Sequence, residues 1–388
     1  MEKNVLLEQK AGNLQMALNR QEGTYVPNMI NNGTATVAWE GKKTSELMMG
    51  NPMEYVEVLN KIYEEMWADA NILSGNMFSP KMEQAFDTLE TRYGPDGVTP
   101  EHVQLSPMKQ DEYDQLIADP NRYVANVLLP RKFPTLFTDR EGAKRSLKLY
   151  AEDRFYSMIQ LMGMSARHQA EKYGIVQCLN MQERFETPLD ILFDYFRGFR
   201  GTLTDLRRQR ANVEAALDKL WETRCAAQNA SPVKDANAGW GPQFCHIPAY
   251  LSPKQYDELF WPHQKKQIER LANAGGKAYI VLEGRWEKIW HHFLELPKDC
   301  CVLHIDDDDI VTAKKALGDH QILVGGLKTA DVRMKSFEQI RDDVKRVIDE
   351  CAPGGGFLYS TDKCWIASGD VNQTLIDAYN FAHEYSKK

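Results

Sequence analysis

The sequence predicts an α/β protein built as a single (β/α)8 barrel, a TIM barrel, with an N-terminal helical extension. Eight short apolar runs are spaced along the chain, and segments of helical character lie between them. Two of these runs turn abruptly polar where they end, at Glu283 and at His304. Buried parallel strands that deliver functional groups at their C-terminal ends have this pattern. No internal repeat or firm boundary divides the 388 residues, so we expect residues 1–388 to form one domain.

The composition narrows the class of protein. Hydrophobic residues make up 43% and charged residues 26%, which is ordinary for a globular domain. The net charge of −8 disfavours a nucleic-acid partner, because no basic stripe is available to bind phosphates. No run of about 18 apolar residues predicts a membrane span, and the polar N-terminus does not resemble a signal peptide. Seven cysteines, an odd number, do not suggest a disulfide framework and favour a cytoplasmic setting.

The N-terminal half is expected to supply one helix and three strands. Residues 1–22 form the helical extension, which ends at Gly23. Residues 80–135 are polar and rich in proline and aspartate, so we interpret them as an excursion of short helices outside the barrel. Further helices are expected at 52–66 and 139–172. The predicted strands are 25–30, 69–73 and 174–179.

The C-terminal half is expected to supply the other five strands. Ser252 followed by Pro253 is an N-cap with proline at the first helical position, so a helix should begin there. The four aspartates at 306–309 look like a calcium-binding cluster. We expect them instead to cap the next helix, because carboxylates are favoured at a helix N-terminus. The predicted strands are 243–247, 278–282, 301–305, 322–324 and 356–360.

Glu283 and His304 follow neighbouring strands, so both should lie at the C-terminal rim of the barrel. Adjacent strands are about 4.8 Å apart, which lets two such side chains converge on one metal ion. Carboxylate and imidazole are both zinc ligands. The alternative is structural: Glu283 would cap the helix that begins at Arg285, and His304 would be a hydrogen-bonded residue below a loop.

Several phrases resemble the uroporphyrinogen decarboxylase superfamily. Leu-Ser-Pro-Lys-Gln-Tyr at 251–256 with Trp-Pro at 261–262 is similar to one of its helices, and Gly-Gly-Gly-Phe-Leu-Tyr-Ser at 354–360 to its final strand. Other phrases resemble one branch, the corrinoid-dependent methyltransferases of anaerobic O-demethylase systems. These are Glu-Tyr-Asp at 112–114, Asp-Pro at 119–120, Leu-Pro-Arg at 129–131, Arg-Gly-Phe-Arg-Gly at 197–201 and Glu-Gly at 283–284.

The resemblance implies an enzyme that cleaves the methyl ether of a methoxylated aromatic and transfers the methyl group to the cobalt(I) of a separate corrinoid protein. Relatives that methylate thiols bind zinc through a His-x-Cys pair, whose positions here hold Val281 and Glu283, and through a later cysteine near Cys364. We therefore expect Glu283, His304 and Cys364 to bind zinc, with Glu283 and His304 catalytic. The zinc would stabilise the departing phenolate as a Lewis acid.

The substrate pocket is expected over the same rim. Asn32, Trp240, His246 and Tyr359 are the candidates, with the two large aromatic side chains stacking on the substrate ring. The alternative for each is a structural role.

Two other functions stay open. A cofactor-free decarboxylase of a tetrapyrrole is disfavoured, because residues 29–36 lack the arginine phrase that such enzymes use to hold carboxylates. A non-enzymatic binding barrel would retain no zinc. The sequence does not identify the methyl donor, the corrinoid protein or whether the chain forms a homodimer.

Overall fold

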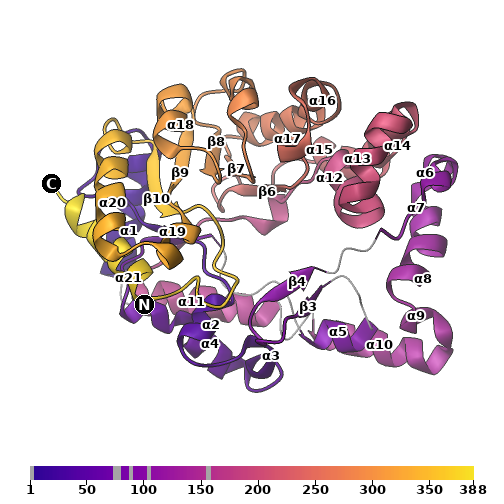
Figure 1. Cartoon of the computed structure of the whole chain (residues 1–388), viewed down its shortest axis with the longest axis horizontal. Coiled ribbons are helices and arrows are strands. Elements are labelled where there is room, and N and C mark those ends of the chain that lie inside the picture. Colours follow the sequence, from indigo (N-terminus) through magenta and orange to yellow (C-terminus); the bar gives the residue numbers. More distant parts are fainter. Residues whose placement is uncertain (1–3, 73–79, 87–90, 103–105, 154–158) are drawn as a thin grey trace.

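Eight parallel strands form the centre of the molecule (Figure 1). The computed structural model describes residues 4–72, 80–86, 91–102, 106–153 and 159–388. Each of the eight predicted strands is present, although the first three are shorter than expected. They are β1 (Met29–Ile30), β2 (Ala70–Asn71), β5 (Val176–Gln177), β6 (Gly241–Cys245), β7 (Ala278–Leu282), β8 (Cys301–Ile305), β9 (Ile322–Leu327) and β10 (Phe357–Thr361).

The strands follow one another around a ring. Strands β1, β2 and β5 pair in that order, and β6 to β10 pair in chain order. Two isolated parallel bridges, Asn28 with Tyr359 and Leu179 with Trp240, join these groups at both edges. The predicted (β/α)8 architecture is therefore confirmed.

The N-terminal helix closes one end of this ring. Helix α1 (Val5–Leu18) is capped by Asn4, whose side chain accepts from the Leu7 backbone. Its Leu14 packs in one apolar cluster with interior side chains of the strands. The Lys10 ammonium donates to the carbonyls of Ala68 and Tyr173, just before β2 and β5. Helix α1 therefore lies at the N-terminal end of the strands and leaves the opposite end for chemistry.

Helices of the C-terminal half pack outside the strands, and their caps follow the sequence. Ser252 and Gln255 form a capping box, and Asp309 accepts from Thr312, as predicted. Asp306 and Asp308 were also expected to cap this helix, but they accept from the backbones of Gly284 and Trp286 instead. The helix predicted to begin at Ser252 and Pro253 is divided at Phe260, before Trp261 and Pro262. The elements are α16 (Pro253–Leu259), α17 (Trp261–Asn273), η9 (Glu287–Leu294), α18 (Ile310–Leu317), α19 (Thr329–Met334), α20 (Phe337–Cys351) and α21 (Gln373–Tyr385).

The N-terminal half is richer in short helices. The helix predicted at 52–66 is present as an α-helical and a 3-10 segment. Gly198, with φ of 65°, separates the helical segment that ends at Arg197 from the next helix. The elements are α2 (Ala35–Trp39), α3 (Thr44–Leu47), α4 (Pro52–Asn60), η1 (Lys61–Glu64), α11 (Leu161–Tyr173), α12 (Pro188–Ile191), η6 (Leu192–Arg197), α13 (Gly198–Arg208), α14 (Arg210–Leu220), η7 (Trp221–Cys225) and α15 (Ala226–Ala230).

The excursion reaches away from the strands (Figure 1) and is only partly as predicted. Besides short helices it contains an antiparallel hairpin, β3 (Thr91–Tyr93) with β4 (Pro100–His102), so the purely helical interpretation was wrong there. The Gly-Pro-Asp-Gly turn at 94–97 is its only sequence signal. The helices of the excursion are α5 (Pro80–Phe86), α6 (Tyr113–Ala118), α7 (Pro120–Tyr123), η3 (Val124–Leu128) and α8 (Leu129–Lys132), and it is followed by α9 (Thr135–Thr138) and α10 (Arg140–Glu152).

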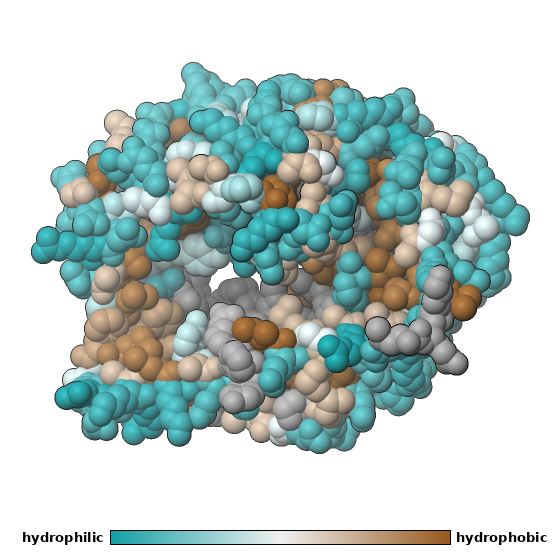
Figure 2. Space-filling model, turned by 180° about the vertical axis from the view of Figure 1, so that it is seen from behind, coloured by the Kyte–Doolittle hydropathy of each residue, from teal (hydrophilic) through white to brown (hydrophobic). Residues whose placement is uncertain are grey.

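Seen from behind, the molecule is hollowed in its middle (Figure 2). Among the described residues, no helix combines the length and the apolar character that crossing a membrane needs.

Candidate functional site

Three polar residues emerge together where β6, β7 and β8 end. The strands pair in register, with Cys245 opposite Leu282 and Leu282 opposite Ile305. The next residue of each strand, which is His246, Glu283 or Asp306, should therefore lie at one level of the rim. The His246 Nε2 and Glu283 Oε2 atoms are indeed 3.6 Å apart. Their side chains are 43% and 54% exposed, so this edge of the mouth is open to solvent.

Two carboxylates of the α12–η6 segment, Asp190 and Asp194, accept hydrogen bonds from His246. The Nδ1 atom of His246 lies 2.9 Å from a carboxylate oxygen of Asp194. Asp190, one helical turn earlier, accepts from the backbone N–H groups of His246 and Ile247 at 3.3 and 3.1 Å. Residues four apart lie on one face of a helix, so a single segment supplies both carboxylates. Thr187 caps this segment through the Asp190 backbone.

This arrangement sets the charge of the imidazole. Burial acts to lower the pKa of His246, but the hydrogen bond and charge of Asp194, helped by Glu283 and Asp190, outweigh it and raise the pKa to about 9. Burial, followed by the nearby Asp194 charge, raises the pKa of Asp190 to about 8. Burial also raises the pKa of Glu283. At neutral pH His246 is therefore an imidazolium, and one ring nitrogen of it faces the mouth.

The rim continues with charged residues beside Glu283. Asp306 is buried and accepts from the Gly284 backbone at 2.8 Å. Its other oxygen lies 3.4 Å from the ammonium of Lys363, which is half-exposed. Burial raises the pKa of Asp306 to about 6. The mouth therefore presents both an imidazolium and an ammonium to an incoming ligand.

His304 does not reach Glu283, contrary to the sequence-based expectation. It lies within β8 opposite Val281, one level below the rim, and is fully buried. Its Nδ1 atom is 2.5 Å from the hydroxyl of Tyr279, and its Nε2 atom is 2.7 Å from the carbonyl of Thr361. Burial lowers its pKa. Both ring nitrogens are thus engaged in the barrel interior, and the structural alternative describes this residue.

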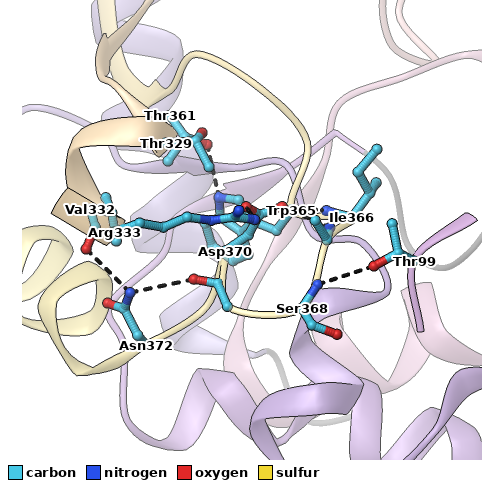
Figure 3. Close-up of polar contacts among 12 residues, drawn as sticks. Thr99, Thr329, Val332, Arg333, Thr361, Trp365, Ile366, Ser368, Asp370 and Asn372 are labelled. Atoms are coloured by element: carbon cyan, nitrogen blue, oxygen red, sulfur yellow. Dashed lines mark hydrogen bonds and ion pairs between the residues drawn. The ribbon is translucent and has the colours of Figure 1, made fainter. Parts of the chain in front are cut away.

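Cys364 lies in the loop after β10. Contacts of Ser368 and Asn372 fasten this loop to other segments (Figure 3). The Trp365 backbone donates to the Asn31 carbonyl and accepts from Ala35. Further along the loop, the Ser368 backbone donates to Thr99 of the hairpin, and Asn372 donates to the carbonyl of Val332.

The thiol of Cys364 lies near Gly33. Burial raises the pKa of this thiol to about 12, so it is neutral at pH 7. Among the residues that the structure describes, no three of His, Cys, Asp or Glu gather where one metal ion could be held. The predicted zinc set of Glu283, His304 and Cys364 is therefore not assembled.

Only His246 of the four predicted substrate-binding residues lies at the mouth. Asn32 is buried and donates to the Leu59 carbonyl. Trp240 stacks on Tyr279 in the interior cluster, with ring centroids 6.1 Å apart. Tyr359 is fully buried and packs edge-on against Tyr379 in the helical layer. All three side chains are buried and make these interior contacts, whereas the ring of His246 is partly exposed.

Asp190 and Asp194 were missed by the sequence reasoning. Their spacing of four residues, in a helix that starts at Pro188 soon after the third strand, is the signal that would have found them.

The phrases shared with the methyltransferase branch turn out to fasten the excursion. Arg131 places two nitrogens on the two carboxylate oxygens of Glu112, at 2.8 and 2.7 Å. Arg197 donates to the buried carboxylate of Asp205 at 2.6 Å, and the hydroxyl of Tyr113 donates to the same oxygen at 2.9 Å. Bidentate and buried pairs of this kind fix orientation. The excursion is thereby tied to α13.

The fold and the residues at the rim show that this protein is a (β/α)8 barrel with a charged site at the C-terminal ends of its strands. Residues 188–362 match the family model of uroporphyrinogen decarboxylase. This stretch of the chain is therefore similar to the uroporphyrinogen decarboxylase family, in agreement with the resemblance of its phrases. The matched stretch contains Asp190, Asp194, His246, Glu283 and Asp306.

Among solved structures, a methyltransferase from Methanosarcina mazei is similar, with a TM-score of 0.62 and 14% sequence identity over 97% of this chain and 98% of that one. At that identity the likeness shows the fold. No curated protein matches the chain in sequence.

Proposed function

We propose that this protein is a methyltransferase that removes the methyl group of a methoxylated aromatic and transfers it to the cobalt(I) of a corrinoid on a separate protein. The match of residues 188–362 to the family model of uroporphyrinogen decarboxylase and the fold shared with a methyltransferase support this proposal. Residues 29–36 are buried and contain no cation, which counts against a tetrapyrrole polycarboxylate as substrate. The observation that carries the proposal is the His246 imidazolium at the open mouth.

Cleavage of an aryl methyl ether needs an acid, because the leaving group is otherwise a phenolate. In the proposed step the methyl–oxygen bond breaks as the methyl carbon bonds to the acceptor, and His246 donates its Nε2 proton to the ether oxygen. The product is a neutral phenol, and the imidazole recovers its proton from water. A general acid with a pKa of about 9 is well matched to a phenol of pKa about 10.

The carboxylates around His246 have distinct roles in this step. Asp194 accepts from Nδ1, so Nε2 carries the proton that faces the mouth. In the proposed complex the ether oxygen lies beside Nε2, on the side of the ring where Glu283 is 3.6 Å away. In-line displacement needs the acceptor, the methyl carbon and the oxygen to be nearly collinear, which requires the methyl group to point outwards. The half-exposed rim leaves room for that approach, and we expect a transient interface with the corrinoid protein.

Zinc has no step in this mechanism. His246 Nε2 and Glu283 supply two donors at the mouth, and no three possible ligands gather among the described residues, whereas zinc takes three or four protein ligands. Metal analysis of the purified protein tests this point. One zinc per chain, lost in Glu283→Ala, would restore the Lewis-acid role that the sequence predicts.

The experiment is a methoxyarene screen with reduced corrinoid protein, comparing the wild type with His246→Asn. His291→Asn, a change at an exposed histidine, is the matched control. We expect demethylation to fall by about 10²- to 10⁴-fold in His246→Asn, as is typical for loss of a general acid, and to be unchanged in the control. We also expect free reduced cobalamin to replace the corrinoid protein poorly.

Three outcomes would contradict the proposal. Full activity in His246→Asn would show that His246 is not the general acid. Release of methanol without any corrinoid would indicate a hydrolase instead. Turnover of a porphyrinogen would restore the decarboxylase.

A further inference from the structure

Two adjacent thiols, Cys300 and Cys301, lie at the N-terminal end of β8, which is the end of the strand away from the rim site. Their sulfur atoms are 3.6 Å apart. Along a regular strand consecutive side chains point to opposite faces, which would direct two adjacent sulfurs apart. The short distance therefore means that Cys300, which precedes the strand, turns its thiol towards that of Cys301.

The turn before β8 holds this arrangement. Asp299 has φ of 59°, a left-handed conformation that residues other than glycine seldom adopt. Its carboxylate accepts from Arg20 at 2.6 Å, and its backbone N–H donates to the His320 carbonyl at 2.9 Å. The side chain of Gln321 accepts from the Cys301 backbone at 2.9 Å. Contacts with other segments thus maintain an unfavourable turn, and the turn keeps the two sulfurs together.

The two thiols differ in acidity. The hydrogen bond of Cys301, helped by Gln321 and by the charge of Lys277, lowers the pKa of the Cys300 thiol although burial opposes it. The Lys277 ammonium is fixed beside the pair, because it donates to the Asp299 carbonyl at 2.6 Å. Burial raises the pKa of Cys301. Cys300 is therefore the thiol that ionises more readily, and the thiolate is the nucleophilic form.

The remaining thiols of the chain lack this environment. Burial raises the pKa of all five, which are Cys178, Cys225, Cys245, Cys351 and Cys364. Cys364 is nevertheless more exposed than Cys300, which retains 5% exposure. Accessibility alone would make Cys364 the most reactive cysteine, whereas thiolate character favours Cys300.

We propose that Cys300 and Cys301 form a redox-reactive dithiol, in which a hydroperoxide oxidises Cys300 and Cys301 then closes a disulfide between the adjacent residues. A reactive thiol with a second thiol in contact is the arrangement that reversible oxidation requires. Cys301 is fully buried, so an oxidant of the size of water meets Cys300 first.

The proposed reaction has two steps. The Cys300 thiolate attacks one peroxide oxygen, the O–O bond breaks, and the departing hydroxide takes a proton from solvent and leaves as water. The sulfur of Cys301 then attacks the resulting sulfenic acid, the S–O bond breaks, and the hydroxyl group leaves as a second water with the thiol proton. Two electrons pass from the sulfurs to the peroxide, and no other reactant is needed.

The disulfide should be easy to reduce. Consecutive Cα atoms are about 3.8 Å apart, whereas the Cα atoms of ordinary disulfides are about 4.4–6.8 Å apart, so a bond between adjacent residues is strained. Strained disulfides are the labile ones. The inference does not depend on the proposed function, because the pair lies at the opposite end of the strands from His246.

Limited alkylation of the folded, reduced chain with iodoacetamide, followed by peptide mass mapping, is the first test. We expect Cys300 to be labelled at least about tenfold faster than Cys364, because only the Cys300 thiolate is stabilised. Hydrogen peroxide should remove two hydrogen atoms from the unlabelled protein and join Cys300 to Cys301. Reduced glutathione should restore both thiols.

Variants assign the role of each residue. In Cys301→Ser, peroxide should leave a sulfenic acid at Cys300 that dimedone traps. Lys277→Met should slow disulfide formation about three- to tenfold, whereas Lys298→Met, at an exposed lysine nearer in sequence, should not. Cys351→Ser removes a buried thiol of α20 and should react like the wild type. Circular dichroism and the thermal midpoint check that each variant is folded.

The wild type alone can overturn the inference. It is wrong if Cys364 is labelled before Cys300, or if peroxide forms no disulfide between the adjacent thiols of the folded chain. Failure of dimedone to label Cys300 in folded Cys301→Ser would also contradict it. Equal oxidation rates in Lys277→Met and Lys298→Met would show that the Lys277 charge does not activate Cys300.

Discussion

The substitution Asp194→Asn tests the charge relation on which the rim site depends. In the wild type the imidazole of His246 lies 2.9 Å from the Asp194 carboxylate, and its pKa is raised from 6.5 to about 9. The amide keeps the size of the side chain and removes its charge. Burial alone would lower the histidine pKa, so without Asp194 the value should fall towards 6.5.

The magnitude follows from these values with one correction. The full difference is about 2.5 pKa units, from 9 to 6.5, but His246 is 43% exposed and water screens the pair. We therefore expect a drop of about 1–2.5 units. With a pKa near 6.5, about a tenth of the imidazole is protonated at pH 7.5, where the wild type is almost wholly protonated. Demethylation at pH 7.5 should fall by up to about tenfold and recover below pH 6.5.

NMR titration of the imidazole resonances measures the pKa without any assay of activity. Asp307→Asn is the matched control, because this exposed carboxylate of the mouth pairs with Lys363 and does not contact His246. A raised folded-state pKa contributes stability that is present below pH 6.5 and lost as the pH rises through about 9. The wild type should therefore exceed Asp194→Asn in stability near pH 6 and lose that advantage above pH 9. An unchanged His246 pKa in Asp194→Asn would refute this reasoning.

Three stability predictions can be measured by chemical denaturation. Arg197→Met should cost about 3–5 kcal/mol, because it leaves a fully buried carboxylate unpaired, whereas Lys219→Met at an exposed pair should change stability by less than about 1 kcal/mol. Gly33→Ala should destabilise by about 1–3 kcal/mol, since its Cβ would meet a backbone carbonyl oxygen at 2.4 Å; Gly163→Ala, in open space within a helix, should instead stabilise by about 0.5–1 kcal/mol. His304→Ala should cost at least about 2 kcal/mol by leaving two buried hydrogen-bonding groups unpaired. Wild-type stability in either Arg197→Met or His304→Ala would contradict the assigned contacts.

The barrel could be predicted from the sequence because its signals are local. Buried parallel strands are short apolar runs, so β7, β8 and β10 are visible without knowledge of their neighbours. Helix starts are equally local, since Ser252 and Asp309 each cap the residues that follow them. The hairpin at 91–102 escaped because strands of three residues are too short to show alternation.

The physical role of the residues in the family-like phrases became clear only from their contacts in the structure. Arg131 and Arg197 occur in phrases that suggested function, yet both hold the excursion through buried or bidentate pairs with carboxylates. Their partners, Glu112 and Asp205, are 19 and 8 residues away, and no local pattern links them.

Only the tertiary structure decides which side chains meet at the rim. From the sequence alone it could be predicted that Glu283 follows a buried strand and that His246 and His304 lie near the ends of others. The sequence did not determine the register between strands, which decides the level of each side chain along the barrel. Pairing of Leu282 with Cys245 brings Glu283 to His246, whereas pairing of Val281 with His304 leaves that imidazole one level lower, in the interior.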